Sequence, residues 1–199
     1  FGEFVEHTYD TPRLAPEEVK AMLDEGRDMV IVDSRPFTEY NRMNIPTGVD
    51  MPGAELVYRI HELAPNPETF VVVNCAGRTR SIIGSQSLIN AGIPNPVAAL
   101  RDGTMGWHLA GFEVEKGSTR QAEAPGPRGT EAALAAAARV AERFGVQTVT
   151  PATVAQWQSE LDRTTYLLDV RSPDEFEANH PAGWRHAPGG QLVQATDEY

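Results

Sequence analysis

Cysteine, long hydrophobic runs and positive charge are all scarce in this sequence, and each scarcity excludes a class of protein. A single cysteine in 199 residues cannot form an internal disulfide, which favours a reducing compartment and predicts a cytoplasmic location. No run of about 18 apolar residues is present, so we expect no membrane-spanning helix and no membrane partner. Seventeen basic residues against 28 acidic ones give a net charge of −11, which argues against a nucleic-acid partner.

The patterns of metal and cofactor sites are missing as well. The histidines show no ligand-like spacing, so we predict neither a metal nor a cofactor. The sequence opens with Phe1 rather than Met and has no basic segment leading into an apolar one, so we identify no signal peptide.

An internal repeat organises the chain. Asp33-Ser34-Arg35 recurs as Asp169-Val170-Arg171, at an offset of 136 residues (169 − 33). Each triplet ends an apolar run, 29–32 or 166–168, and both runs are typical of buried strands. Three further pairs match at the same offset: Glu39-Tyr40 with Glu175-Phe176, Pro52-Gly53 with Pro188-Gly189, and Leu56-Val57 with Leu192-Val193.

Strands and helices alternate along the first copy of the repeat. This alternation predicts an α/β fold with a central parallel sheet covered by helices on both faces, a three-layer arrangement. Strands are expected at 29–32, 70–73 and 97–100, and helices at 16–26 and 81–90, the second closing at Gly92. Farther along we expect a linker at 117–129, a helix over 131–144, and a helix that begins at Pro151 with Thr150 as N-cap.

The second copy of the repeat stops early. The position equivalent to Cys75 would be 211 (75 + 136), which lies beyond Tyr199. We therefore expect a tandem repeat with an incomplete second copy, taken from a longer multi-repeat protein. Further repeats of that protein, or another copy of the chain, are the protein partners that this organisation suggests.

Cys75 lies in a loop that suits a nucleophile. The segment Asn74-Cys75-Ala76-Gly77-Arg78-Thr79-Arg80-Ser81 joins an expected strand to an expected helix, at the carboxyl edge of the sheet where α/β proteins place their sites. The loop amides, the helix N-terminus and two arginines all favour a thiolate over a thiol. A lone cysteine can also be a small buried apolar residue, but the glycine, threonine and arginines that follow make a poor core environment.

The motifs around this loop resemble those of the rhodanese family. Asp33-Ser34-Arg35 is similar to the family's D-x-R at a strand end, and Glu39-Tyr40 to its acidic-aromatic pair. Gly103-Thr104-Met105-Gly106-Trp107, followed by Leu109-Ala110-Gly111, resembles its closing motif. The resemblance implies four segments: an N-terminal extension 1–10, a complete catalytic domain 11–118, a linker with an Ala-rich helix 119–146, and the N-terminal half of a second rhodanese-like domain 147–199.

The resemblance also implies a thiosulfate sulfurtransferase. Cys75 would take the outer sulfur of a small sulfur-containing anion such as thiosulfate, hold it as a persulfide, and yield it to cyanide or a thiol. The substrate-binding residues implied are Ala76, Gly77, Arg78, Thr79 and Arg80: their amides would cradle the persulfide, and the two arginines would hold the sulfonate.

Two other functions remain open at this stage. A phosphatase or arsenate reductase also uses a cysteine in an anion-binding loop, but it needs Cys-x5-Arg, and Arg80 comes one position too early. A rhodanese-like module can also bind or regulate without turnover, and Cys75 argues against that for the first copy.

Several other residues of the motifs favour structural roles. For Asp33, Arg35 and Trp107 we favour scaffold and packing roles over catalysis. Asn44 replaces a histidine that many members carry at this position and that the second copy keeps as His180, and we assign Asn44 no role.

Overall fold

The computed structural model describes residues 1–194, and the chain divides into two compact units, Phe1–Ala137 and Ala138–Tyr199. The last five residues of the predicted half-domain 147–199 lie outside the described residues. Among the described residues, no helix combines the length and apolar character that crossing a bilayer requires.

A five-stranded parallel sheet forms the centre of the first unit, which confirms the predicted α/β class. Its strand order is β1-β5-β4-β2-β3. The strands are β1 (Arg13–Leu14), β2 (Met29–Asp33), β3 (Val49–Asp50), β4 (Phe70–Asn74) and β5 (Val97–Leu100).

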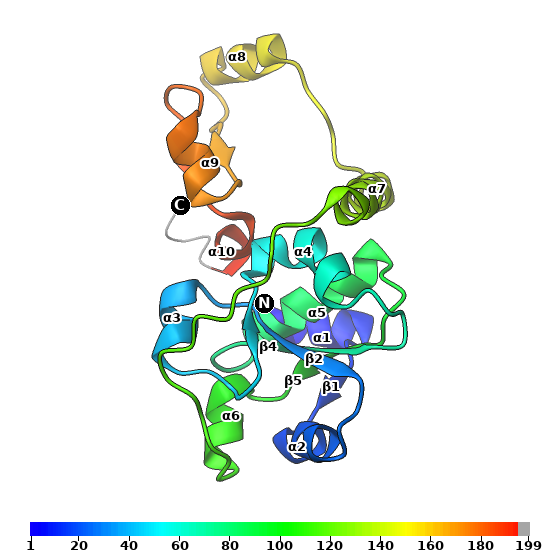
Figure 1. Cartoon of the computed structure of the whole chain (residues 1–199). Helices are drawn as coiled ribbons and strands as arrows, with labels where there is room; N and C mark the ends of the chain where they lie inside the picture. The colour runs from blue at the N-terminus through cyan, green and yellow to red at the C-terminus, as the bar shows by residue number, and fades with distance from the viewer. Residues whose placement is uncertain (195–199) are drawn as a thin grey trace. The chain divides into compact units, whose positions relative to one another are not determined.

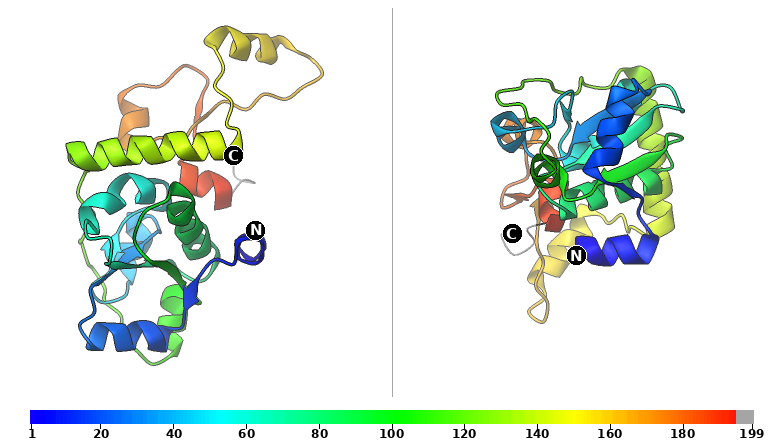
Figure 2. Two further views of the ribbon diagram at one scale, coloured as in Figure 1. Left: turned by 90° about the vertical axis from the view of Figure 1, so that its right-hand side faces the viewer. Right: turned by 90° about the horizontal axis from the view of Figure 1, so that it is seen from below.

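Helices cover both faces of this sheet, so the fold has three layers (Figures 1 and 2). One face carries α1 (Gly2–Tyr9), α4 (Leu56–Leu63) and α5 (Thr79–Ala91), and the other carries α2 (Pro16–Asp24) and α6 (Gly103–Leu109). The short helices α3 (Phe37–Arg42) and η1 (Gly53–Glu55) lie in the connections around β3.

The side chains of β4 show why two helical layers are needed. Val71 and Val73 pack into one apolar cluster with Leu56 of α4 and Leu88 of α5, whereas Val72 packs into another with Val19 of α2 and Trp107 of α6. Successive residues of a strand point to opposite faces, so a run of buried valines requires cover on both sides.

Most element boundaries follow the sequence expectations. Strand β5 has the predicted bounds, and α2 begins at Pro16. Helix α5 begins at Thr79, two residues before the prediction, and ends at Ala91, with Gly92 as a C-cap in a left-handed conformation, as expected. Helix α7 (Pro127–Phe144) begins at Pro127 rather than Glu131, because proline is well tolerated in a first helical turn.

The second unit contains a smaller copy of the same arrangement. Its elements are α8 (Pro151–Ser159), β6 (Leu168–Asp169), α9 (Pro173–Ala178), β7 (Arg185–His186) and α10 (Gly189–Gln194). Thr150 caps α8 as predicted, because its side chain accepts from the amide of Thr153. The strand pairings Leu168 with Arg185 and Val32 with Val49 keep the 136-residue offset (168 − 32 and 185 − 49).

The expectation of a buried strand at 166–168 is wrong. Tyr166 is 69% exposed, and the strand starts only at Leu168. Within the described part of this unit the sheet has two strands, so few elements are present to cover an apolar run.

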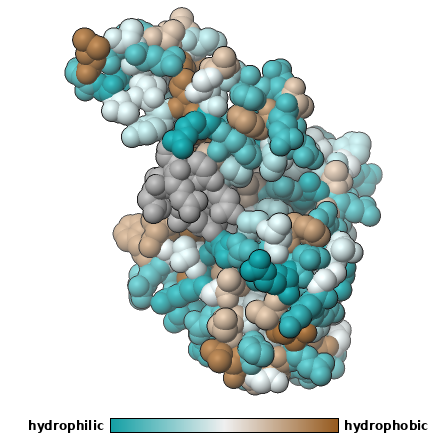
Figure 3. Space-filling model, turned by 90° about the vertical axis from the view of Figure 1, so that its left-hand side faces the viewer, coloured by the Kyte–Doolittle hydropathy of each residue, from teal (hydrophilic) through white to brown (hydrophobic). Residues whose placement is uncertain are grey.

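Exposed hydrophobic residues are scattered rather than gathered on the face shown in Figure 3, where hydrophilic residues predominate. Single apolar residues are ordinary on a folded surface.

Candidate active site

The carboxyl ends of the central strands bring the predicted motifs together. Asp33 of β2 pairs in register with Asn74 of β4 on one side and with Asp50 of β3 on the other. Cys75 follows β4 directly, and α5 starts four residues later at Thr79. The predicted position of Cys75 at this edge of the sheet is therefore the observed one.

The loop after Cys75 presents a row of backbone N–H groups. Within the described chain, the amides of residues 76–80 donate no hydrogen bond to another protein group. These donors include the first amides of α5, which have no intrahelical acceptor and carry the positive end of the helix dipole. Such a row of free N–H groups is an anion-binding arrangement.

The sulfur itself is enclosed. Cys75 is only 1% exposed, and its thiol donates to Ser81 Oγ at 3.4 Å. The hydroxyl of Ser81 in turn donates to the carbonyl oxygen of Arg78 at 3.0 Å. A hydroxyl can rotate, so Ser81 can accept from a thiol and donate to a thiolate or a persulfide in the same place.

The start of α6 fixes the carbonyl side of the loop. The amide and hydroxyl of Thr104 donate to the carbonyl oxygen of Cys75 at 2.8 Å and 3.1 Å, and the amide of Met105 donates to that of Ala76 at 3.1 Å. Gly103 has φ +55°, and a Cβ there would lie 2.4 Å from the Cys75 carbonyl oxygen and 2.8 Å from the Gly77 amide nitrogen. Only glycine permits this close approach of α6 to the loop.

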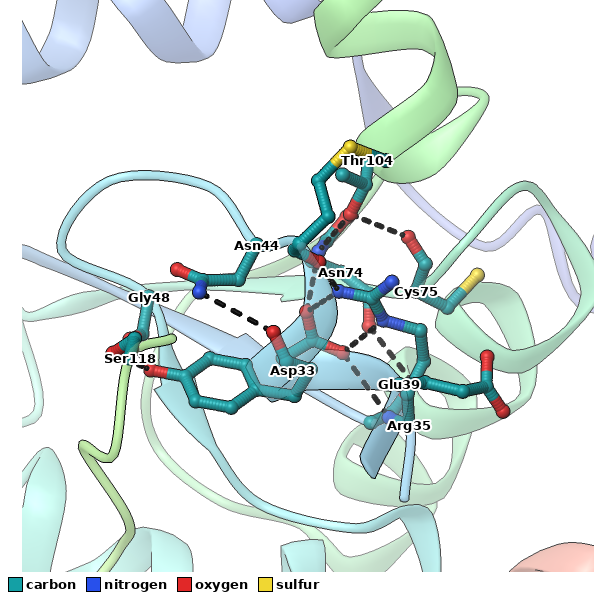
Figure 4. Close-up of polar contacts among 12 residues, drawn as sticks. Asp33, Arg35, Glu39, Asn44, Gly48, Asn74, Cys75, Thr104 and Ser118 are labelled. Carbon is teal, nitrogen blue, oxygen red and sulfur yellow. Dashed lines mark hydrogen bonds and ion pairs between the residues drawn. The ribbon is translucent and has the colours of Figure 1, made fainter. Parts of the chain in front are cut away.

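Asp33 and Arg35 form a buried ion pair that supports the loop. Arg35 Nε and Nη2 donate to the two carboxylate oxygens of Asp33 at 2.8 Å and 2.7 Å, and Asn74 Nδ2 donates to Asp33 Oδ2 at 2.8 Å. Asn74 also donates to Thr104 Oγ1 at 2.9 Å, which links the pair to the carbonyl oxygen of Cys75 (Figure 4). The sulfur points away from this network in Figure 4, as a scaffold role for Asp33 and Arg35 requires.

The second unit repeats the same ion pair without a cysteine. Arg171 donates to both carboxylate oxygens of Asp169 and, at 2.7 Å, to the carbonyl oxygen of Asn179, as Arg35 does to that of Met43. The hydrogen bonds to Arg171 hold the pKa of Asp169 down at about 2. Because the motif keeps this geometry without a cysteine loop beside it in the described residues, it supports a structural role for Asp33 and Arg35.

Glu39 holds the side chain of Arg80 in place. Its two terminal nitrogens donate to the two oxygens of Glu39 at 2.7 Å and 2.8 Å. This hydrogen bonding lowers the pKa of Glu39 and raises that of Arg80, to whose shift the charge of Cys75 also contributes. The side chain of Arg80 is therefore oriented by a bidentate carboxylate partner.

Arg78 turns instead toward the N-terminal helix. Its guanidinium group lies 2.8 Å from Glu6 Oε2 and 3.4 Å from Glu3 Oε1, both on α1. The predicted loop residues thus share one row of backbone amides, whereas their two arginine side chains pair with carboxylates on different helices.

Two other motif residues have packing roles. Trp107 is buried and donates to the carbonyl oxygen of Glu113, and its ring packs at a tilt against that of Phe112, with 4.9 Å between the centroids. Asn44 is buried, and it exchanges backbone hydrogen bonds with Glu115. Among residues 1–194, no three His, Cys, Asp or Glu side chains gather as a metal ion would need.

Sequence reasoning missed three residues of this site: Ser81, Gly103 and Glu6. Ser81 follows the loop directly, and its place in the first turn of α5 was the available signal. Gly103 belonged to a quoted motif, but its approach to Cys75 depends on how α6 docks. Glu6 lies 72 residues from Arg78 in the sequence, and no local pattern predicts that the two residues pair.

Comparison with known proteins identifies the class of this fold. Residues 15–110 match the family model of the rhodanese-like domain, so this part of the chain is a rhodanese-like domain. The crystal structure of a thiosulfate sulfurtransferase from Pseudomonas aeruginosa is 60% identical over the whole of this chain, with a TM-score of 0.95, and this chain covers 38% of it.

Two curated relatives match about half of this chain. The HTH-type transcriptional regulator Rv0324 of Mycobacterium tuberculosis is 32% identical over 47% of this chain and 41% of its own length. YrkF of Bacillus subtilis, named as a candidate sulfur carrier protein, is 28% identical over 50% of this chain and 54% of its own length. The chain thus spans only part of the relatives that it matches.

Proposed function

We propose that this chain is a sulfurtransferase in which Cys75 carries a sulfane sulfur as a persulfide. The observation that carries the proposal is the row of free backbone N–H groups of residues 76–80 beside the only cysteine. The match to the rhodanese-like domain and the similarity to a thiosulfate sulfurtransferase support the same activity.

The first half-reaction loads the cysteine. The Cys75 thiolate attacks the outer sulfur of thiosulfate, the S–S bond of the donor breaks, and sulfite leaves with the bonding electron pair. The negative persulfide that remains is stabilised by the amides of Ala76, Gly77, Arg78, Thr79 and Arg80 and by a hydrogen bond from Ser81. The guanidinium group of Arg80, in the first turn of the helix that follows the cysteine loop, is suited to the sulfonate oxygens of the donor.

The second half-reaction unloads it. A thiophilic acceptor attacks the outer sulfur of the persulfide, and the electron pair of the S–S bond returns to Cys75 as thiolate. Cyanide then leaves as thiocyanate, and a thiol leaves as a new persulfide. Because Cys75 is enclosed, the residues around it must shift before the sulfur donor or the acceptor can reach its sulfur.

Intact-mass spectrometry of the full chain tests this proposal. Wild-type protein mixed with thiosulfate should gain the mass of one sulfur atom and lose it on addition of cyanide, whereas Cys75→Ser should gain nothing. A gain that persists in Cys75→Ser refutes the role of Cys75. No gain in the wild type favours a non-catalytic module, and release of phosphate from an aryl phosphate favours a phosphatase.

A further inference from the structure

Helix α1 precedes the matched domain, and it packs against α5, the helix that follows the cysteine loop. Val5 packs with Ile82 of α5 and Ala99 of β5. Gly2 lies so close to Thr79 that an added Cβ would be 2.8 Å from its Cα. The helix therefore contacts the first turn of α5, directly after the cysteine loop.

Two carboxylates of α1 neutralise one of the loop arginines. Glu6 is only 8% exposed and contacts Arg78 and Arg13, while Glu3 also contacts Arg78. The charges that raise the pKa of Arg78 come from Glu6, Glu3 and Asp102, whereas Arg80 also feels the charge of Cys75. Of the two loop arginines, Arg78 is the one that is drawn toward α1.

The charges of the side chains paired around the loop consequently balance. Three guanidinium groups form ion pairs with three carboxylates: Arg13, Arg78 and Arg80 with Glu3, Glu6 and Glu39. The free amides still attract one negative charge, but the side chains add little net attraction for a second charge. The site therefore attracts a doubly charged donor such as thiosulfate less strongly than the loop sequence predicts.

We propose that Glu6 is a specificity-determining residue that withdraws Arg78 from the donor and favours singly charged or neutral alkyl persulfides over dianionic thiosulfate. The inference rests on the proposed sulfur transfer through Cys75. With a protonated persulfide donor, the Cys75 thiolate attacks the outer sulfur and the donor's S–S bond breaks. The alkyl thiolate leaves with the electron pair, and the proton stays on the transferred sulfur.

Steady-state kinetics of a Glu6→Gln variant tests the proposal. The probes are thiosulfate and the persulfide of 2-mercaptoethanol, each with cyanide as acceptor. Glu6→Gln should raise kcat/KM for thiosulfate by about fivefold, because it frees one positive charge near the loop, and change that for the alkyl persulfide less than about twofold. Adding Arg78→Gln to Glu6→Gln should remove the gain, since the gain is attributed to the freed guanidinium group.

A matched control separates this local effect from the change in net charge. Glu17→Gln removes the same charge from the exposed first turn of α2, on the other face of the sheet, and should leave both kcat/KM values unchanged. Thermal unfolding of each variant verifies that the fold is retained.

The outcomes distinguish the inference from the function on which it rests. If wild-type protein takes sulfur from either donor but Glu6→Gln leaves the ratio of the two kcat/KM values unchanged, the role of Glu6 is refuted and the sulfurtransferase stands. A gain that survives the added Arg78→Gln also refutes it. If neither donor loads Cys75 in the wild type, both proposals fail together.

Discussion

Replacing Gly103 by alanine should damage both the stability of the first unit and the geometry of the cysteine loop. Gly103 has φ +55°, where an L-residue costs about 1 kcal/mol. An added Cβ would also lie 2.4 Å from the Cys75 carbonyl oxygen. Because that atom belongs to the backbone, the contact is relieved only by moving the loop, at a further cost of about 2 kcal/mol.

The two costs together should lower Tm by about 10 °C for a unit of this size. The displaced loop should reduce kcat/KM for sulfur transfer by at least about tenfold, since the amides proposed to stabilise the transferred sulfur would be moved. Thermal unfolding followed by circular dichroism measures the first quantity, and thiocyanate formation measures the second.

Gly111→Ala is the matched control for this experiment. Gly111 also has positive φ, +85°, but an added Cβ would meet nothing within 4 Å. It should therefore lose only about 1 kcal/mol, a fall in Tm of about 3 °C, with the transfer rate unchanged. Equal losses of Tm and kcat/KM in the two variants would refute the claim that Gly103 is required for the approach to Cys75.

Two further predictions concern the hydroxyl at the sulfur and a buried carboxyl. Ser81→Ala should lower kcat/KM at pH 7 by about tenfold, because a hydrogen-bond donor to the thiolate and the persulfide is lost. As a control, Ser85→Ala removes an unpartnered buried hydroxyl from the same helix and should leave kcat/KM unchanged. Burial raises the pKa of Asp50 from 3.8 to about 7, so its neutral form stabilises the native protein below about pH 4, and this contribution is lost as pH rises to about 7. Asp50→Asn should therefore gain about 2 kcal/mol of stability relative to wild type between pH 4 and pH 8, allowing for solvent screening. A difference in Tm that stays constant across this range would contradict the assignment.

The fold was predictable because its signals are local. A run such as Phe70 to Val73 is short, β-branched and followed by a glycine-containing loop, and only a strand buried on both faces accommodates it. The same holds for Pro16 at the start of α2 and for Gly92 at the end of α5, where one residue satisfies one backbone requirement. Helix α1 has no comparable start signal, since Phe1 at its N-cap makes no side-chain cap hydrogen bond. The sequence therefore predicts residues 1–10 only as an N-terminal extension.

The candidate site was predictable in its backbone and unpredictable in its charges, for one physical reason. The position of Cys75 and its amides follows from the strand-loop-helix order, which is local, whereas each loop arginine finds its carboxylate far along the chain: Glu39 is 41 residues from Arg80, and Glu6 is 72 residues from Arg78. A sequence shows the two guanidinium groups beside the cysteine but not the carboxylates that fold against them, so it overstates the positive charge at the sulfur. The sequence alone therefore favours the most highly charged donor, whereas the ion pairs of the folded chain favour our proposal of donors with lower charge.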